Sequence, residues 1–565
     1  MPTPSPGGVP VPSSRRYAED PRLPRGTGAD LGSLARKYPD QDRTILHVLD
    51  DQVRVRPDQD WLVFDGRDRL TFRQAQQAAY RFAVAAAESG FAVPRVSLLL
   101  RNQREFMPAF LGAQAAGGFA APLNPELRGP LLETLLLRCE AQILVVRADL
   151  VPTLRDAPSL GDVELVLVCG EAEQGPPVHG VPVQEFGAWC DQFPATVPAS
   201  RPAPSDLAAL VFTSGTSGGS KAAMWSHHYL YLSSATVADS LGHTPADVLS
   251  TPLQMCHIAG LQVFAFSALH AGCTAHLKSS FSASRWWDEI VADKATFAML
   301  MGQMAAMVLD RVPEVPAHEL RYVYILPQPA RRKEFEERYR TTVIWQGWGM
   351  TEIFPHVPSK TRLEGVSDDT IGLPPGWVDF GVVDESDRML APGELGQLVY
   401  RPLIPDAMAS GYYGDPTASA LAFRNFMFHT GDLGYYDELG RVHFVMRNTD
   451  AIRRRGENIS AVELENIARR HPRISDAAAY AVPSTLGEHE VKLDVITSDE
   501  LPIDLGEFHR WLTENLPRFM LPRYLEQRAD FPRTISQRVE KYKLAAESPG
   551  RPGVREFSPP RRPAS

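Results

Sequence analysis

The chain has 565 residues, of which 44% are hydrophobic and 22% charged, and its formal net charge is −10. This length is enough for a large core and more than one domain. The acidic balance argues against nonspecific binding to nucleic acid, and no apolar run approaches the roughly 18 residues needed to cross a membrane. The five cysteines are scattered without metal-binding spacing, and residues 1–12 do not have the charged-then-apolar pattern of a leader, so we expect a cytoplasmic globular protein.

The two ends of the chain lack hydrophobic periodicity. Residues 1–40 begin with Pro, Gly and Ser, and residues 546–565 contain the run Pro-Pro-Arg-Arg-Pro. Such composition is typical of disordered segments. Between these tails we expect a large domain over residues 41–446 and a small one over residues 447–545.

Helical patterns alternate with short apolar runs in the large domain. Residues 71–89 and 105–116 have the apolar spacing of helices, whereas residues 96–100 and 142–146 have the composition of buried strands. This alternation predicts an α/β fold with layered and largely parallel sheets.

The most distinctive segment follows the apolar run 207–212 and consists of hydroxyl residues and glycines closed by one lysine. Its members are Thr213, Ser214, Gly215, Thr216, Ser217, Gly218, Gly219, Ser220 and Lys221. Glycine lets successive N–H groups converge on an anion, and hydroxyl and ammonium groups add donors, so the run predicts a polyphosphate-binding loop. A Walker A loop is disfavoured, because that motif has Gly before the lysine and Ser or Thr after it, whereas Ser220 and Ala222 stand here. A flexible surface linker is the alternative interpretation.

Residues 347–352 offer a second part of a nucleotide site. They combine Trp348, Thr351 and Glu352 with two glycines that permit close backbone approach. This set suits aromatic stacking, phosphate contact and magnesium binding. Taken alone, Trp348 would be interpreted as a core residue.

Two further segments carry charge suited to a ribose and a phosphate. Residues 429–433 place Asp432 after an expected tight turn, where its carboxylate could accept both hydroxyls of a ribose. Arg447 and residues 453–456 add positive charge at the expected domain junction. Taken singly, Asp432 could be a turn residue and the arginines a solvated surface strip.

The small domain begins with a helix signal. Residues 460–463 have the form of a capping box, which predicts a helix from there to about His471. The apolar run 477–482 predicts a strand of an α+β unit that ends near Leu544.

Taken in order, these segments resemble the adenylate-forming superfamily of acyl-CoA synthetases, peptide-synthetase adenylation domains and luciferases. Further segments that carry the resemblance are residues 70–72, 122–125, 252–260, 393–396, 411–416 and 532–534. Within the superfamily, residues 324–326 and 456–466 look closest to carnitine and crotonobetaine-CoA ligases. The resemblance covers nearly the whole chain and implies a large domain of layered αβ subdomains followed by a small, mobile α+β domain.

The resemblance implies a two-step reaction. A small acid attacks the α-phosphate of ATP and releases pyrophosphate, and the adenylate is then attacked by a nucleophile, most often the thiol of CoA. ATP and Mg²⁺ are the implied cofactors, and CoA is the implied co-substrate. No nucleic-acid partner or membrane span is expected, and the oligomeric state is left open.

The resemblance also implies roles for individual residues. The implied catalytic residues are Lys221, Thr351, Glu352 and Arg538, and the implied metal-binding residues are Thr216 and Glu352. The implied ATP-binding residues are Thr213, Ser214, Gly215, Thr216, Ser217, Gly218, Trp348, Gly349, Thr351, Asp432 and Arg447. The implied acid pocket contains Met255, His257, Met301 and Trp348, the hinge is at Thr449, and Arg455 and Gly456 border the CoA passage. Taken alone, His257 would be interpreted as a core histidine.

The chain departs from the family pattern at three places. Arg538 stands where the family has a catalytic lysine, Ser220 replaces a proline of the phosphate loop, and Arg455 replaces one of two paired glycines. Arginine keeps the charge of lysine but is planar and wider, so the first exchange is not conservative. Lys541 and Lys543 are nearby candidates for the missing ammonium group.

These departures leave two alternatives beside an acid-CoA ligase. One is an ATP-dependent diazotase, which would activate nitrite for attack by an aromatic amine. The other is a nucleotide-binding homologue that no longer catalyses. The identity of the acid is left open by the sequence.

Overall fold

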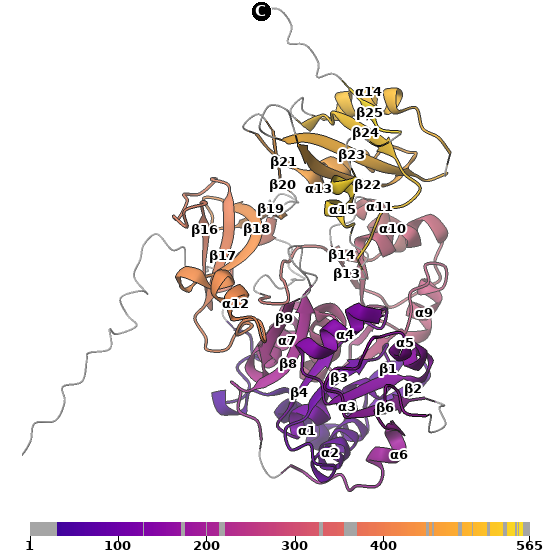
Figure 1. Ribbon diagram of the computed structural model, residues 1–565, viewed down its shortest axis with the longest axis vertical. Coiled ribbons are helices and arrows are strands. Elements are labelled where there is room, and N and C mark those ends of the chain that lie inside the picture. The colour runs from indigo at the N-terminus through magenta and orange to yellow at the C-terminus, as the bar shows by residue number, and fades with distance from the viewer. Residues whose placement is uncertain are drawn as a thin grey trace, which may run out of the picture.

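The computed structural model describes residues 31–127, 129–170, 176–198, 201–213, 221–326, 331–354, 370–447, 451–454, 457–483, 489–499, 501–516, 520–534, 539–547, 551 and 553–557. Figure 1 shows a large layered part formed by the first two thirds of the chain and a smaller C-terminal part that carries β20 to β25. The α/β fold class with a large and a small domain is therefore confirmed.

Two seven-stranded sheets form the large domain. The first contains, in spatial order, β7 (Val183–Glu185), β6 (Leu165–Cys169), β5 (Ile143–Arg147), β3 (Arg95–Leu99), β4 (Phe119–Pro122), β8 (Leu207–Thr213) and β9 (Lys221–Ser226). The second contains β14 (Thr342–Ile344), β13 (Tyr322–Leu326), β12 (Phe297–Met301), β10 (Val248–Thr251), β11 (Thr274–Leu277), β1 (Asp60–Phe64) and β2 (Asp68–Thr71). Neighbouring strands pair in parallel except at β9 and β2, which are antiparallel edge strands.

Alternating residues along these strands contact different helix layers. Ile143 and Val145 of β5 join the largest core cluster, whereas Leu144 and Val146 join a second cluster on the opposite face of the sheet. The largest cluster packs both sheets against α1 (Ile45–Val55), α2 (Phe72–Glu88), α3 (Phe106–Ala115), α6 (Phe186–Cys190), α7 (His227–Leu241), η4 (Ala259–Phe266) and α8 (Ser267–Ala271). The outer faces are covered by α4 (Gly129–Arg138) and α5 (Val151–Arg155) on one sheet and by α9 (Trp286–Asp293), α10 (Gly302–Arg311) and α11 (Arg332–Tyr339) on the other.

A third sheet follows the two parallel ones. It is antiparallel, in the order β15 (Thr370–Gly372), β19 (Val442–Arg447), β18 (Phe428–Tyr436), β17 (Gly396–Pro402) and β16 (Val378–Val383), and α12 (Pro416–Ala422) lies between β17 and β18 in the chain. The residues from 429 to 433 therefore lie in a strand and not in a tight turn, although Gly431 has φ 73°. Arg447 ends β19, so the third sheet reaches one residue past the predicted boundary at 446.

The small domain has its own core. A hairpin of β20 (Ala451–Arg454) and β21 (Glu457–Ser460) precedes a sheet in the order β22 (Ile474–Pro483), β23 (His489–Thr497), β24 (Tyr524–Gln527) and β25 (Arg555–Glu556). Its helices are α13 (Ala461–Ala468), α14 (Leu505–Asn515) and α15 (Lys541–Ala546). The helix predicted after residue 460 and the strand predicted at 477–482 correspond to α13 and β22.

The ordered chain is longer at both ends than the sequence predicted. Residues 31–40, assigned to a disordered tail, pack on α7, where Asp239 accepts hydrogen bonds from the amides of Leu34 and Ala35 at 3.0 Å. Ala35 is fully buried. At the other end β25, within the predicted tail 546–565, pairs with β24. Too few residues contact the core at either end to give a periodic pattern in the sequence.

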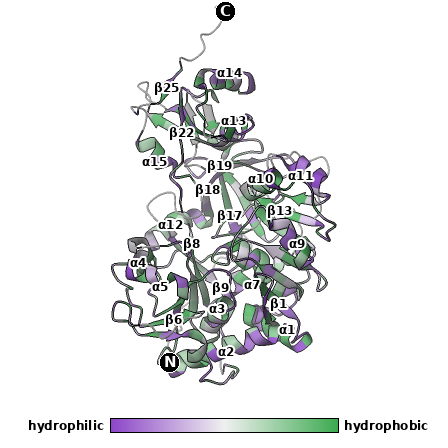
Figure 2. Ribbon diagram, turned by 90° about the vertical axis from the view of Figure 1, so that its right-hand side faces the viewer, coloured by the Kyte–Doolittle hydropathy of each residue, from purple (hydrophilic) through white to green (hydrophobic). Residues whose placement is uncertain are grey.

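Predicted elements in the large domain are confirmed closely. The segment 71–89 forms α2, with the Thr71 and Gln74 side chains making a reciprocal capping box, and the segment 105–116 forms α3. Figure 2 shows hydrophobic residues along the strands and hydrophilic residues along exposed helices such as α11. Among the described helices, none combines the length and apolarity needed to cross a membrane.

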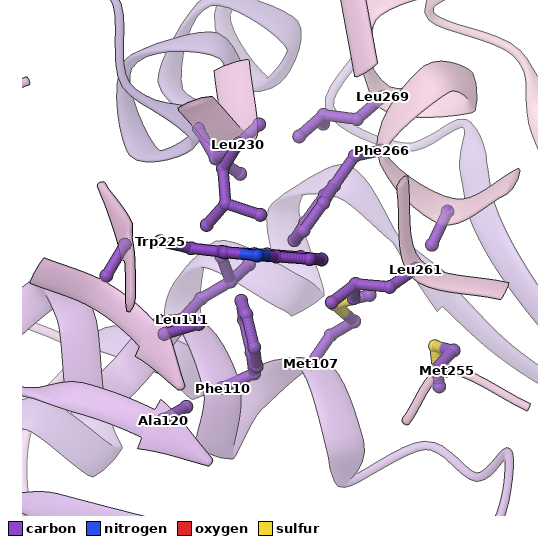
Figure 3. Packing of buried hydrophobic residues seen from close by; sticks show 14 of the residues in the cluster. Met107, Phe110, Leu111, Ala120, Trp225, Leu230, Met255, Leu261, Phe266 and Leu269 are labelled. Atoms are coloured by element: carbon purple, nitrogen blue, oxygen red, sulfur yellow. The ribbon is translucent and has the colours of Figure 1, made fainter. Parts of the chain in front are cut away.

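The core between the sheets is centred on aromatic side chains. Figure 3 shows the indole of Trp225 between Leu230 and Phe266 on one side and Phe110 and Leu111 on the other. Trp225 is fully buried, and it belongs to β9, the strand that begins with Lys221. The strand that follows the predicted phosphate loop is thus anchored in the largest core cluster.

Among the described buried polar side chains without a hydrogen-bond partner, Gln262 lacks one at both of its amide atoms. η4 has a π-helical pattern, and its Gln262 is fully buried with neither side-chain amide atom hydrogen-bonded within the described chain. A buried amide without a partner costs free energy, because it has lost its hydrogen bonds to water.

We expect Gln262→Leu to raise the free energy of unfolding by about 1–3 kcal/mol, since an apolar side chain of similar size removes that cost. Urea unfolding followed by tryptophan fluorescence measures the effect. Gln114→Leu is the matched control, because Gln114 is equally buried but its side-chain nitrogen donates to the carbonyl of Ala208 at 3.2 Å, and only its oxygen lacks a partner among the described residues. Equal destabilisation by both substitutions would contradict the prediction.

Candidate active site

The predicted phosphate loop connects two antiparallel strands. Thr213 at the end of β8 is the register partner of Lys221 at the start of β9. Lys221 therefore begins a strand and not a helix, which agrees with the exclusion of a Walker A loop. The predicted ATP-binding residues Ser214, Gly215, Thr216, Ser217 and Gly218 lie outside the described residues.

A segment of the connection between β17 and α12 runs along the free edge of β9. The amide of Met224 donates to the carbonyl of Gly411 at 2.9 Å, the amide of Tyr413 donates to the carbonyl of Ala222 at 2.8 Å, and an antiparallel bridge joins Ala223 to Tyr412. Residues 410–413 thus extend the first sheet beyond β9, although nearly 200 residues separate the two segments in the chain.

Tyr412 of this segment and the preceding Ala409 contact Glu352, one of the two predicted metal-binding residues; the other, Thr216, lies outside the described residues. The amide of Ala409 donates to the backbone carbonyl of Glu352 at 2.8 Å, and the hydroxyl of Tyr412 donates to the Glu352 carboxylate at 2.7 Å. Glu352 is 3% exposed. Burial and the nearby carboxylate raise the pKa of Tyr412 well above its ordinary value, so its hydroxyl stays protonated and acts as a donor.

Lys221 contacts the ring of Tyr412. Its Nζ is 5.0 Å from the centre of the Tyr412 ring, within the range of a cation–π contact. Thr351 is fixed through its backbone carbonyl, which accepts a hydrogen bond from the Trp225 indole at 2.8 Å. The predicted catalytic residues Lys221, Thr351 and Glu352 are therefore brought together around β9, whereas Arg538 lies outside the described residues.

Trp348 and Asp432 contact each other directly. The Trp348 indole donates to the Asp432 carboxylate at 2.9 Å, and its ring stacks on Tyr400 with centroids 5.2 Å apart. Both residues are buried, at 8% and 2% exposure. The adjoining Gly349 permits close packing, because a Cβ there would lie 1.8 Å from the Phe354 ring.

Arg447 is the cross-strand register partner of Asp432 in the β18–β19 pair. The two residues predicted to bind a ribose are therefore neighbours on adjacent strands. The predicted hinge residue Thr449 and the predicted CoA-passage residues Arg455 and Gly456 lie outside the described residues.

The predicted acid-pocket residues follow the carboxyl ends of parallel strands. His257 comes after β10, Met301 ends β12, and Trp348 comes after β14, all at the same edge of the second sheet. His257 is exposed, so its interpretation as a core histidine is wrong. Met301 is 40% exposed, whereas Met255 is fully buried in the core cluster and lies near Leu261 in Figure 3.

Both candidate lysines for the missing ammonium group have carboxylate partners within the small domain. Lys541 is 2.8 Å from Glu465, and Lys543 is 2.5 Å from Glu540. Glu465 is buried and also accepts a hydrogen bond from the Ala479 amide at 2.8 Å, which fixes it in the domain core. These ion pairs favour structural roles for the two lysines.

Sequence reasoning missed three aromatic residues of the site. Tyr412 contacts both Lys221 and Glu352, Trp225 supports Thr351, and Tyr400 stacks on Trp348. Tyr412 lies in the segment 411–416, which carried the family resemblance but suggested no role for its side chain. Among the described residues, no cluster of three or more His, Cys, Asp or Glu could hold a metal ion.

Comparisons with known proteins agree with this arrangement. A family profile described as AMP-binding enzyme matches residues 49–413. The crotonobetaine/carnitine–CoA ligase of Citrobacter koseri is 28% identical over 516 residues, which cover 89% of this chain and 99% of that protein. The ligase of the same name from Salmonella typhi is 30% identical over 466 residues, which cover 80% of this chain and 88% of that protein.

Solved structures share the fold. The anthranilate CoA ligase AuaEII in complex with anthranoyl-AMP matches with a TM-score of 0.80 at 22% identity, covering 91% of this chain and 98% of that one. The O-succinylbenzoate CoA synthetase from Bacillus subtilis in complex with AMP matches with a TM-score of 0.75 at 22% identity, covering 88% and 97%. The resemblance seen in the sequence is confirmed, and the chain belongs to the AMP-binding enzyme family.

Proposed function

We propose that this protein is an ATP-dependent ligase that adenylates a small carboxylic acid and transfers the acyl group to CoA. One observation carries the proposal. The ammonium group of Lys221 and the buried carboxylate of Glu352 both contact the side chain of Tyr412, next to the end of the loop 213–221. Family membership and relatives named as CoA ligases over most of the chain support it.

The adenylation step needs charge stabilisation and not a strong base. The acid is already a carboxylate, and its oxygen attacks the α-phosphorus of ATP while the bond to pyrophosphate breaks. The loop 213–221 would hold the β- and γ-phosphates with backbone amides and hydroxyls, and Lys221 would supply positive charge. Thr351 would contact the α-phosphate.

The residues fit a magnesium ion that arrives with the nucleotide. Mg²⁺ is usually bound by one or two carboxylates together with substrate phosphates and water, so the single buried carboxylate of Glu352 is an adequate protein ligand, with Thr216 as a second donor. When bound, the ion would neutralise phosphate charge. Glu352 would hold it, and Tyr412 would hold Glu352.

The nucleoside would lie between Trp348, which follows β14 of the second sheet, and Asp432, which lies in β18 of the third sheet. Asp432 would accept the ribose hydroxyls, with Arg447 beside it, and Trp348 and Gly349 would border adenine. Because the Asp432 carboxylate accepts from the Trp348 indole, ribose binding would exchange or share this hydrogen bond. His257 and Met301 would border the acid.

In the second step the thiol of CoA would attack the acyl carbon and release AMP. Gly456 would leave room for the pantetheine chain, with Arg455 at its side, and rotation about Thr449 would bring this part of the small domain to the adenylate. The thiol loses its proton, and AMP leaves as the phosphate anion.

The reaction class is tested by pyrophosphate and AMP release with aromatic acids, aliphatic acids, carnitine-like acids, and nitrite with an aryl amine, each with and without CoA. We expect release that depends on a carboxylic acid, and a thioester only when CoA is present. Release that requires nitrite and the amine would instead identify a diazotase. ATP binding without turnover on any substrate would identify a noncatalytic homologue.

We expect Arg538→Ala to lower the adenylation rate roughly a hundredfold, because a cation that would stabilise the developing phosphate charge is lost. Arg538→Lys should retain the rate within about tenfold, since the charge remains. Both are measured as pyrophosphate release, with the exposed Arg510→Ala as a control in the same domain. An unchanged rate in Arg538→Ala would remove this residue from the mechanism.

A further inference from the structure

Tyr412 connects the two charged residues of the proposed site. Its hydroxyl is 2.7 Å from Oε1 of Glu352, and the Nζ of Lys221 is 5.0 Å from its ring centre. The side chain is 7% exposed, so both interactions act in an environment from which water is largely excluded. A hydrogen bond to a charged group and a cation–π contact are each stronger when desolvated.

The backbone around Tyr412 is fixed on two sides. Its amide donates to the Ser419 hydroxyl at 2.8 Å, and its neighbours pair with β9 as described above. Gly411 has φ 133°, a conformation that side-chain-bearing residues rarely adopt, and a Cβ there would also lie 3.0 Å from the Ser419 hydroxyl oxygen. The backbone that carries the ring is therefore held by contacts that do not involve the side chains of Glu352 or Lys221.

A ring on a fixed backbone can select one conformation of longer side chains that contact it. The Glu352 side chain has rotatable bonds that allow its carboxylate several directions, and the Lys221 side chain has more. The Tyr412 hydroxyl fixes the direction of the Glu352 carboxylate through a hydrogen bond, and the Tyr412 ring offers one face to the Lys221 ammonium group. A single side chain thus sets the separation of a cation and an anion that would act on the same polyphosphate.

We propose that Tyr412 is a positioning residue that orients Glu352 for the metal through its hydroxyl and Lys221 for the phosphates through its ring. This rests on the roles proposed above for Glu352 and Lys221. The two functions of the side chain are separable, because phenylalanine keeps the ring and loses the hydroxyl, whereas leucine loses both.

The test compares Tyr412→Phe and Tyr412→Leu with the wild-type full-length protein. We expect Tyr412→Phe to weaken binding of Mn²⁺ in the presence of a nonhydrolysable ATP analogue by roughly tenfold, measured by electron paramagnetic resonance, with little change in metal-free binding of the analogue. Excess Mg²⁺ should restore its adenylation rate. Tyr412→Leu should weaken both metal binding and metal-free binding of the analogue.

The adjacent Tyr413→Phe is the matched control, because the Tyr413 hydroxyl contacts the exposed carboxylate of Glu140 at 3.1 Å, away from Glu352. It should leave both binding measurements unchanged. If Tyr412 has a purely structural role, Tyr412→Phe and Tyr412→Leu should lower the melting temperature without changing the metal dependence of binding. That result would overturn the proposal.

Failure of this inference is distinguishable from failure of the proposed function. If the wild-type protein binds the metal and the ATP analogue but adenylates no acid, the binding measurements still decide the role of Tyr412. If Tyr412→Phe binds Mn²⁺ as tightly as the wild type while adenylation by the wild type is normal, the inference is wrong and the proposed function stands.

Discussion

The candidate site depends on the pairing of residues 410–413 with the free edge of β9. This contact joins a loop of the third sheet to the strand that begins with Lys221, and through Ala409 it also fixes the backbone of Glu352. An edge strand leaves unpaired N–H and C=O groups, which favour the addition of another extended segment. Here the added segment belongs to the same chain. The pairing therefore satisfies the edge and brings two chemically important parts of the sequence together.

The strength of this arrangement comes from the core beneath it. Trp225 lies on β9, is fully buried, and donates to the carbonyl of Thr351. One face of the strand is thus anchored between helices, while its edge is occupied by residues 410–413. A short hairpin can hold a glycine-rich loop in place only if its strands are immobile. The apolar packing around Trp225 holds β9, the strand that follows the predicted phosphate loop, in place.

Local structure and charge could be predicted from the sequence, because both depend on residues that are adjacent in the chain. The helix of residues 72–88 follows from its apolar spacing and its cap at Thr71. The composition of residues 213–221 predicts a phosphate loop. Residues 31–40 could not be predicted as ordered, since their main partner is Asp239, about 200 positions away. The role of Tyr412 could not be predicted from the sequence for the same reason. A tyrosine in a loop has no periodic signal, and only the fold brings its hydroxyl to Glu352.

The contact between Trp348 and Asp432 bears on how nucleotide binding would proceed. A buried carboxylate is costly without hydrogen bonds, and the Trp348 indole supplies one at 2.9 Å. If Asp432 binds ribose, the nucleotide replaces or joins an existing partner and does not satisfy a bare charge. The net gain is then smaller than the strength of the new hydrogen bonds, because the old bond is weakened. Under the proposed function, contacts to the polyphosphate would then supply more of the affinity for ATP, and the proposed roles of Lys221 and Glu352 depend on their relative positions.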